Sequence, residues 1–282
     1  MGATKLVTVV RSGLAGEIQY IRGVCDLTLE VICDQLGWQQ SKLSRMENGE
    51  QCISTADLAS LLVIYKVRGK ERQRLLHLVD RQDEPGYWDF DPPSDMESRP
   101  LMRLEPEATA LVAAETLVMP GLVQTADYTR AIMHAAKVSS EQVEPRVEAR
   151  RLRQSVLTAG KPPKFDMIVH EAALRQVVGN PKIMAAQLRA MLKVAEQPNV
   201  RLWVVPFKMA GNAGFNLPFY LMNFPRSKSV VYLESMTSGV YLEDTKKIDY
   251  FRGQAAVLAK VALSPADSAS LVVRVAREHD RE

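Results

Sequence analysis

The stretch that most constrains the fold is residues 27–49, LTLEVICDQLGWQQSKLSRMENG. Apolar side chains recur in it with helical spacing, at Leu29, Ile32, Cys33 and Leu36. The next residue, Gly37, tolerates the left-handed conformation that ends a helix. A second short helix then begins almost at once, with Leu43 and Met46 directed back toward the first. Its opposite face is predicted to be polar and to carry Gln40, Ser41, Ser44, Arg45 and Asn48.

Two short helices joined by a glycine turn, with a polar outer face on the second, are typical of a helix-turn-helix that enters the major groove of DNA. Gln pairs with adenine and Arg with guanine through two hydrogen bonds, and Ser can contact either base. The alternative is a plain helical hairpin whose polar face is only solvated. The unbroken pattern, with the turn glycine in place, favours the DNA-binding interpretation.

The same stretch resembles the repressor-type, Xre/Cro-like helix-turn-helix family. The matching positions are Leu27, Thr28, Glu30, Leu36, Gly37, Gln40, Ser41, Ser44, Arg45, Glu47, Asn48 and Gly49. Three positions depart from the family pattern: Leu29 replaces a Gln, Trp38 a small aliphatic residue, and Gln39 a capping Ser. We expect the first departure to remove one contact to the DNA backbone, and the third to leave the second helix less well capped.

Together the helix face and the resemblance assign DNA binding to Thr28, Gln39, Gln40, Ser41, Lys42, Ser44, Arg45, Asn48 and Arg68. Base contacts are expected from Gln40, Ser41, Ser44 and Arg45. Phosphate contacts are expected from Lys42, Arg68 and Thr28, with Lys66 and Arg11 as further candidates.

The charge of the chain limits how it can hold double-stranded DNA. Lys and Arg roughly balance Asp and Glu over residues 1–85, and the whole chain has a net charge of +3. This is not the strongly basic surface of a protein held on nucleic acid by charge alone. Binding is therefore expected to rest on a local arrangement of cations and on a homodimer whose half-sites lie about one turn, ~34 Å, apart.

At 282 residues the chain should hold about two domains. Residues 1–82 are predicted to form an all-α, five-helix domain around the motif. One further helix carries Leu14, Ile18, Ile21 and Cys25 inward, with Arg22 solvated on its outer side. Another follows an N-cap at Ser54 and buries Leu58, Leu61, Leu62 and Tyr65. The fifth spans about 70–81 and buries Leu75, Leu76 and Val79.

Prolines, aspartates and serines over residues 83–100 predict a linker, in which Trp88 and Phe90 are too apolar to be left in water. Residues 101–282 are predicted to form an α+β domain. Its expected strands lie at 165–169, 200–206, 219–224 and 230–233. Its expected helices follow the turn at Pro120, begin near Ser140, and span about 172–178, 181–196 and 264–279.

This second half resembles the C-terminal domain of a large group of actinobacterial Xre-type regulators, described as antitoxin-like. The resemblance is carried by PGLVQTADYTRAI, EAALRQVVG, QLRAMLKVAEQPNVRLWVVPF, FYLMNF and VVYLE, and by the arginine-bearing helix from Ser140. It implies an interaction with a small protein encoded beside the regulator; an effector is a separate possibility for the same domain. The residues assigned to that partner or effector are Gln124, Tyr128, Arg150, Arg153 and Glu171.

The arginines at 146, 150, 151 and 153 could bind an anion or an acidic partner. Glu144 and Glu148 lie among them, so a solvated and cross-bridged helix is the preferred interpretation. Glu171 is expected to begin a helix or to pair with one of Arg150, Arg151 and Arg153.

No chemistry is assigned to the remaining polar residues. His170 begins an H-E-x-x pattern, but the second His is replaced by Leu174, which excludes a zinc protease. The three cysteines and four histidines lack metal-ligand spacing, so neither a metal nor another cofactor is expected, and Cys25 and Cys33 are predicted to be small buried residues. The loop 211–216 lacks a phosphate-binding pattern and is expected to be a mobile connection. No catalytic triad can be nominated, and the chain is not expected to be an enzyme.

The N-terminus lacks the layout of a signal peptide and no long apolar run is present, so we expect a cytoplasmic protein without a membrane span. Three functions remain open. The first is a homodimeric, sequence-specific transcription regulator. The second is an antitoxin-like module that sequesters a small protein and regulates its own gene. The third is a regulator that senses a small molecule in its α+β domain.

Overall fold

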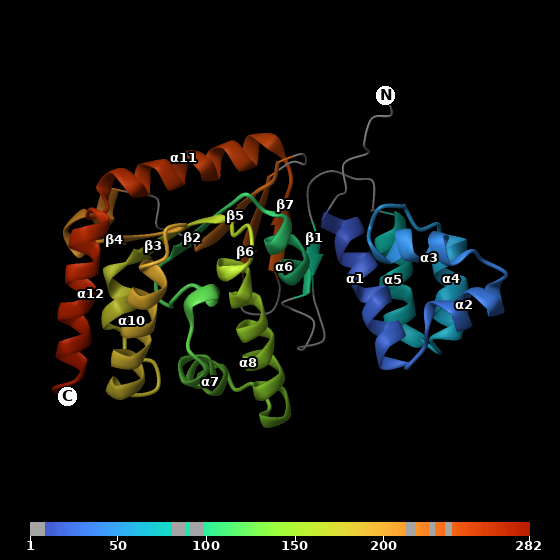
Figure 1. Ribbon diagram of the computed structural model, residues 1–282, viewed down its shortest axis with the longest axis horizontal. Coiled ribbons are helices and arrows are strands. Elements are labelled where there is room, and N and C mark those ends of the chain that lie inside the picture. Colours follow the sequence, from blue (N-terminus) through green and yellow to red (C-terminus); the bar gives the residue numbers. More distant parts are fainter. Residues whose placement is uncertain (1–8, 81–87, 91–98, 213–217, 226–228, 235–238) are drawn as a thin grey trace. The chain divides into compact units, whose positions relative to one another are not determined.

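The apolar stripes of the N-terminal sequence become the helices of the first of two compact units, which span residues 1–88 and 89–282. The computed structural model describes residues 9–80, 88–90, 99–212, 218–225, 229–234 and 239–282 (Figure 1). Within residues 9–80 it has five helices, as predicted: α1 (Val9–Val24), α2 (Leu29–Leu36), α3 (Gln40–Glu47), α4 (Thr55–Ile64) and α5 (Gly69–Asp80).

The core of the first unit is built from one stripe of each helix. Its fully buried side chains include Leu14, Ile18, Ile32, Leu43, Met46, Leu58, Leu61, Leu62 and Leu75. The Ser54 hydroxyl caps α4 by accepting a hydrogen bond from the Asp57 amide, as predicted. Three residues predicted to be buried are only half-buried: Ile21, Cys25 and Leu76. Leu78 takes the place of Leu76 in the core, and Cys33 is buried as predicted.

The second unit is α+β, as predicted. Its strands form one mixed sheet in the order β1-β7-β6-β5-β2-β3-β4. They are β1 (Trp88–Phe90), β2 (Ala110–Glu115), β3 (Lys164–His170), β4 (Val200–Val205), β5 (Phe219–Asn223), β6 (Val230–Glu234) and β7 (Gly239–Leu242). Strands β2, β3 and β4 run parallel to one another, whereas the β2–β5, β5–β6 and β6–β7 pairs are antiparallel.

Helices cover both faces of this sheet. The α-helices are α6 (Arg99–Leu104), α7 (Ala126–Ala135), α8 (Ser140–Gln154), α9 (Glu171–Arg175), α10 (Pro181–Ala195), α11 (Thr245–Val261) and α12 (Pro265–His279). Short 3-10 turns lie at Glu105–Glu107 (η1), Gly121–Val123 (η2), Ser155–Thr158 (η3) and Phe207–Asn212 (η4). Figure 1 shows α11 along one face, with α7, α8 and α10 on the other.

The period-2 alternation of the strands divides their residues between the two faces. Residues Ala114, Ile168, Phe219, Leu221 and Val231 pack with Ile248 and Leu258 of α11 in one apolar cluster. Their chain neighbours Ala113, Glu115, Tyr220 and Tyr232 point to the opposite face, where they line a cavity. Only glycine fits at position 239, because a Cβ there would collide with the Tyr232 ring.

The strands predicted around 165–169, 200–206, 219–224 and 230–233 are present as β3 to β6. Sequence patterns did not predict β1, β2, β7, α6 or α11. Within the predicted linker, residues 88–90 form β1 and α6 begins at Arg99, while residues 83–87 and 91–98 lie outside the described residues. Most of the loop 211–216 also lies outside them.

Among the described residues, no single helix is long and apolar enough to cross a membrane. Only α11 and α12 taken together, bent by 73° at their junction, meet the length and composition of a span.

Candidate functional site

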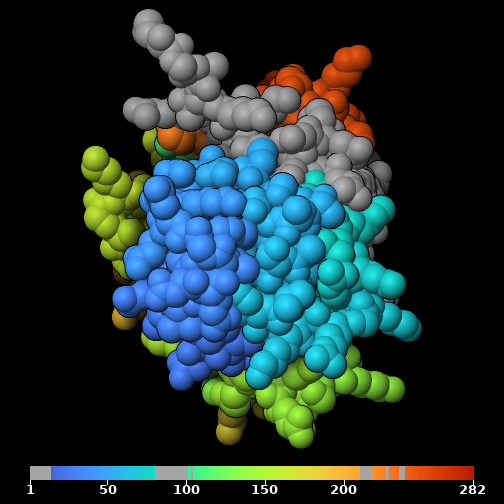
Figure 2. Space-filling view, turned by 90° about the vertical axis from the view of Figure 1, so that its right-hand side faces the viewer, coloured from blue at the N-terminus to red at the C-terminus, as the bar shows by residue number. Residues whose placement is uncertain are grey.

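Helix α3 presents a polar face to solvent and an apolar face to the core. It has eight residues, a length of about 12 Å. Leu43 and Met46 are fully buried beneath it. On the other side Gln40, Ser41, Arg45 and Asn48 are exposed, and Ser44 is half-buried. In Figure 2 the surface of this unit forms one unbroken area, coloured blue to cyan. The residues predicted to contact bases therefore share one accessible helix face.

The turn before α3 follows from its glycine. Gly37 ends α2 in the left-handed conformation, with φ of 64°, and its amide bonds back to the Cys33 carbonyl. The Thr28 hydroxyl caps the start of α2 by accepting from the Val31 amide at 3.3 Å. Gln39 stands at the N-cap of α3 but makes no capping hydrogen bond with its side chain. The weaker capping of α3 expected from the sequence is thus present.

A buried ion pair fastens α3 to α1. The Arg22 guanidinium donates from Nε to Glu47 Oε1 at 2.7 Å and from Nη2 to Glu47 Oε2 at 3.1 Å. Its Nη1 also donates to the Leu27 carbonyl at 2.9 Å. Glu47 is 3% exposed, so this pairing is largely shielded from water. The prediction of a solvated Arg22 was wrong, because the carboxylate that meets it comes from the end of a helix 25 residues away.

Lys42 is held against two neighbours in the same unit. Its Nζ lies 2.7 Å from Asp57 Oδ1 on α4 and 3.9 Å from the centre of the Trp38 ring. An ammonium over an indole face is attracted by the ring's negative face. Trp38, which departs from the family pattern, therefore supports a cation that the sequence assigns to phosphate contact. The Asp57 carboxylate compensates that charge in the unbound protein.

This compensation predicts that Asp57→Asn strengthens DNA binding. The substitution removes one anion and releases Lys42, so the affinity should rise and the slope of log K against log salt should steepen by about one contact, ~0.9. Titrations of the full chain with duplex operator at several salt concentrations measure both quantities. Asp34→Asn makes the same charge change at an exposed position of α2. An equal change of slope in both variants would show that the release of Lys42 does not contribute to DNA binding.

Arg45, Lys66 and Arg68, also predicted to contact DNA, are exposed. Arg45 donates from Nε to Gln51 Oε1 at 3.3 Å. Because the Gln51 side chain is neutral, this hydrogen bond does not compensate the charge of Arg45. Arg68 and Lys66 are exposed in the connection between α4 and α5. Arg11 lies on α1, in the part of that helix whose side chains are not described.

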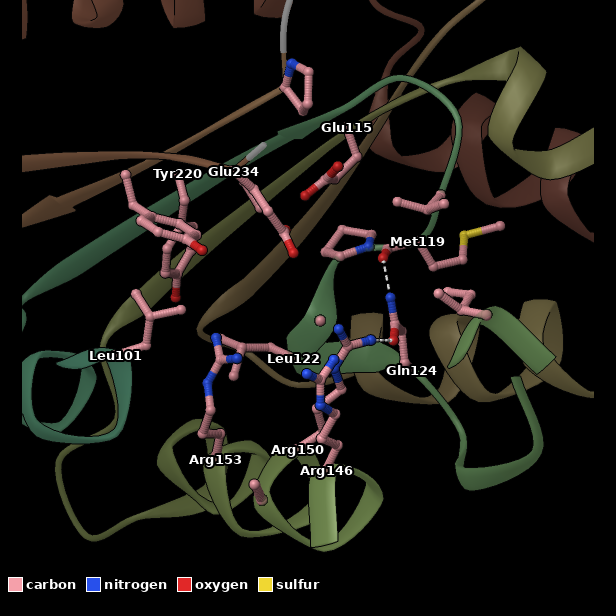
Figure 3. A pocket seen from close by; sticks show the side chains of 18 of the residues that line it. Leu101, Glu115, Met119, Leu122, Gln124, Arg146, Arg150, Arg153, Tyr220 and Glu234 are labelled. Carbon is pink, nitrogen blue, oxygen red and sulfur yellow. Dashed lines mark hydrogen bonds between the residues drawn. The ribbon is translucent and has the colours of Figure 1, made fainter. Parts of the chain in front are cut away.

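The second unit contains a cavity of about 450 Å³ between the sheet and α8 (Figure 3). The sheet side contributes the ends of β2 and β6 and the start of β5, through Glu115, Glu234 and Tyr220. The opposite side is the stripe of α8 formed by Arg146, Ala149, Arg150 and Arg153. A volume of this size lies within the range of pockets that hold small molecules.

The arginines of α8 do not behave as one solvated run. Arg151 is exposed and pairs with Glu148 at 2.6 Å, as the preferred interpretation predicts. Arg146, Arg150 and Arg153 instead face the cavity, since positions i, i+4 and i+7 share one side of a helix. The solvated interpretation was therefore wrong for these three. Their spacing was the sequence signal that could have separated them from Arg151.

Arg153 is fixed by a buried acid. It donates from Nε and Nη2 to the two oxygens of Glu105, at 3.0 and 2.7 Å. The Tyr220 hydroxyl donates to Glu105 Oε1 at 3.0 Å. Both charged side chains are nearly buried, 9% and 1% exposed. Burial and the neighbouring Glu105 carboxylate raise the pKa of Tyr220, so its hydroxyl stays protonated and donates.

Gln124 and Tyr128 hold the wall of the cavity in place. Gln124 donates from Nε2 to the Met119 carbonyl at 2.7 Å, and its Oε1 accepts from Thr129 and from Arg150. The Tyr128 hydroxyl, buried beside the cavity, accepts from the Met119 amide at 3.2 Å. Burial raises the pKa of Tyr128 to about 12. The turn that includes η2 is therefore ordered by buried polar groups.

Glu171 is not among the residues that line this cavity. It begins α9, as expected, and its carboxylate pairs with Arg175 at 2.8 Å and accepts from the Phe207 amide at 3.1 Å. Its partner is thus on its own helix, not one of the arginines of α8, which corrects the predicted pairing. Although burial opposes it, hydrogen bonds from Arg175 and Phe207 lower the pKa of Glu171.

Glu115 is a carboxylic acid of the cavity whose ionisation is strongly perturbed. Burial, reinforced by the nearby Glu234 carboxylate and opposed by Arg150, raises the pKa of Glu115 to about 8. A carboxyl group in this position is largely protonated at neutral pH. No sequence pattern pointed to it, since its surroundings come from three separate elements.

The raised pKa of Glu115 predicts a pH-dependent stability. An unfolded Glu ionises near pH ~4.3, so above that pH folding must keep a proton that the unfolded chain has lost. The stabilisation that protonated Glu115 gives the folded state is fully present below pH ~4.3. It is lost as the pH rises toward 8, at up to ~1.4 kcal/mol per pH unit. Hydrogen exchange in β2 and β3 of the full chain should therefore show the wild type losing stability relative to Glu115→Gln between these limits. Glu148→Gln, on the outer side of α8, is the matched control and should follow the wild type.

Comparisons with known families agree with this division of the chain. Residues 14–75 match a family model described as a helix-turn-helix domain. The first unit is therefore a helix-turn-helix domain, a class that binds DNA and is typical of regulators rather than enzymes. Residues 98–274 match a domain of unknown function, DUF5753. This match covers more than half of the 282 residues, so the chain belongs to the DUF5753 family. No curated protein and no solved structure matches the chain.

Proposed function

We propose that the protein is a sequence-specific, double-stranded DNA-binding transcription regulator of the Xre/Cro type, with α3 as the recognition helix. The observation that carries the proposal is the face of α3. Hydrogen-bonding side chains at Gln40, Ser41 and Arg45 are exposed, while Leu43 and Met46 are fully buried on the other side. A polar face on a short, firmly seated helix can enter a major groove and meet base edges.

Each side chain of this face has a proposed role. Gln40, Ser41, Ser44 and Arg45 contact bases, and Asn48 and Gln39 lie at the two ends of the same helix. Lys42 and Arg68 contact phosphates. Thr28, at the start of α2, adds a contact through its backbone amide, because its hydroxyl already caps the helix.

The regulator is proposed to act as a homodimer. The first unit has little excess of basic residues, so one copy gains little affinity from charge alone. Two copies on half-sites one helical turn apart, ~34 Å, double the number of specific contacts. We propose this dimer together with membership of the actinobacterial, antitoxin-like group of regulators that the second half of the chain resembles.

Arg45 provides the experiment that tests the recognition helix. Arg45→Ala should weaken operator binding by ~1–3 kcal/mol and relax the preference at one base position. Arg45→Lys keeps the charge but loses the planar fork that pairs with guanine, so it should lose the same base preference while keeping the salt dependence. Selection of bound duplexes from a random library, with the full chain and both variants, measures these preferences. An unchanged preference in both variants would refute the role of α3.

For the second unit we propose an effector-binding role. Its cavity has the size of a small-molecule pocket and a polar wall that is already ordered by Gln124 and Tyr128. These observations favour a small effector over the small protein partner that the resemblance implies. Binding in the second unit would then regulate a DNA-binding activity that resides in the first.

A further inference from the structure

Three neighbouring strands of the sheet present two rows of side chains to the cavity. The register pairs Tyr220 of β5 with Ala113 of β2 and with Tyr232 of β6. Successive side chains of a strand point to opposite faces, so the next row on the cavity side lies two residues along each strand. This second row, the acidic row, consists of Glu115, Pro218 and Glu234. All six residues line the cavity, and Figure 3 shows both glutamates on its sheet side.

The acidic row has a carboxylate at each end and an apolar ring between them. Glu115 and Glu234 lie on either side of β5, so their Cα atoms are about 10 Å apart. Pro218 has no polar side chain and no N–H that could bind either of them. Among the described residues, neither carboxylate makes a hydrogen bond or an ion pair. The fold therefore leaves both acids accessible to a molecule in the cavity.

The arginines on the opposite wall are engaged within the protein. Arg153 donates two hydrogen bonds to the buried Glu105 carboxylate. Arg150 donates to the amide oxygen of Gln124 and makes further interactions. Arg146 is likewise engaged with its neighbours. Because these contacts belong to the fold, the acidic row is the better place for a contact with a ligand.

The remainder of the cavity is largely apolar. Its lining includes Val118, Leu122, Ile132 and Phe165. An aliphatic chain or an aromatic ring can be buried against these side chains, and this burial supplies affinity. The acidic row then fixes the orientation of the molecule by binding its polar end.

From this arrangement we propose that the second unit binds an organic cation with an apolar body, such as a primary amine on an alkyl chain or an aromatic ring. Its ammonium lies at the acidic row, where its three N–H donors can be shared between Glu115 and Glu234. Its apolar body lies against the hydrocarbon lining of the cavity. The proposal deepens, and rests on, the effector role proposed for this cavity. It does not depend on DNA binding by α3.

The ionisation of Glu115 provides a second readout. Burial and the Glu234 carboxylate, opposed by Arg150, raise the pKa of Glu115 to about 8, so this carboxyl group holds a proton at neutral pH. The other ionisable groups that line the cavity are Arg146, Arg153, Tyr220 and Tyr232. An ammonium placed beside Glu115 favours its ionised form. Binding of an amine at neutral pH should therefore release a proton to the buffer, and the release should vanish above the pKa of Glu115.

Calorimetric titration of the full chain tests the proposal with hexylamine, phenethylamine and tryptamine. Each amine is compared with the alcohol and the carboxylate of the same carbon skeleton. We expect at least one amine to bind with Kd below about 1 mM, and about tenfold tighter than both of its references. Titrations in buffers of different ionisation enthalpy should show the released proton for the amine and none for the alcohol.

Two results would overturn the proposal. If an alcohol or a carboxylate bound as tightly as its amine, the cavity would still hold a small molecule, but its charge would not be recognised by the acidic row. If none of the probes bound, the effector role itself would lose its support. Operator binding by the same samples is measured separately, so the role of α3 is decided independently.

Variants assign the contact to the acidic row. Glu115→Gln should abolish both the proton release and the tenfold preference for the amine. Glu234→Gln should weaken the preference and reduce the release, because it removes a charge that raises the pKa of Glu115. Glu148→Gln makes the same change on the outer side of α8 and should bind like the wild type. Because the probe series and the proton release are measured on the wild type, poor folding of a variant does not decide the result.

Discussion

Arg153→Met is expected to destabilise the second unit by about 3–5 kcal/mol, because it leaves the buried Glu105 carboxylate without its guanidinium. Glu105 is 1% exposed, so water cannot replace the two hydrogen bonds that Arg153 donates. The Tyr220 hydroxyl would remain as a donor to Glu105, but a neutral hydroxyl does not compensate a negative charge. The burial of the pair, not its number of contacts, sets the size of this effect.

The measurement is hydrogen exchange of the full chain, followed in peptides from β2, β5 and α8. Arg151→Met is the matched control: this neighbouring arginine is exposed and pairs with Glu148 in water, so its loss should leave the stability close to that of the wild type. The double variant Arg153→Met with Glu105→Leu removes both charges and should recover much of the loss. If the single and double variants were equally unstable, the lost volume and packing, not the unpaired charge, would be the cause.

The sequence was sufficient for the parts of the fold that depend on neighbouring residues. Helical stripes and single capping residues, such as Gly37 and Ser54, located the helices of the first unit to within a few residues. Strands rich in Val, Ile and Phe were equally visible, as in β3 and β4.

Elements whose composition suits another structure were missed. Strand β2, ALVAAE, lies inside the sheet, yet three of its six residues are Ala and it ends in Glu, residue types that favour helices. It is a strand because β3 and β5 pair with it on both sides. Strand β7 has only four residues and begins with a glycine, so it carries little pattern of its own. Pairing with neighbouring strands, and not local composition, makes β2 and β7 strands.

The candidate sites divide in the same way. The recognition helix could be found because all its residues lie within one short stretch, and its outer face follows from helical spacing alone. The cavity could not, because Glu115 and Glu234 are brought to one face by the register of β2, β5 and β6. Nothing local distinguishes these two glutamates from solvated ones. Only the inward spacing of the arginines on α8 was readable beforehand.

The ion pair between Arg22 and Glu47 is another contact that spacing did not reveal, and it yields the second large expected effect. Arg22→Met should destabilise the first unit by about 3 kcal/mol, since Glu47 is 3% exposed and would lose the guanidinium that compensates its charge. The hydrogen bond with Glu47 also raises the pKa of Arg22, so its guanidinium stays charged. Because Glu47 is the last residue of α3, the loss should be greatest where the recognition helix meets α1.

Hydrogen exchange and operator binding, measured on the same full-length samples, separate this role from direct contact with DNA. Arg22→Met should speed exchange of the α3 amides and weaken operator binding in proportion, with the base preferences unchanged. Arg45→Met, in the same helix but exposed, should leave α3 exchange within about 0.5 kcal/mol of the wild type while the base preference at one position is lost. Unaltered α3 exchange in Arg22→Met would mean that Leu43 and Met46 alone seat the helix, and that the buried pair contributes nothing to presenting it.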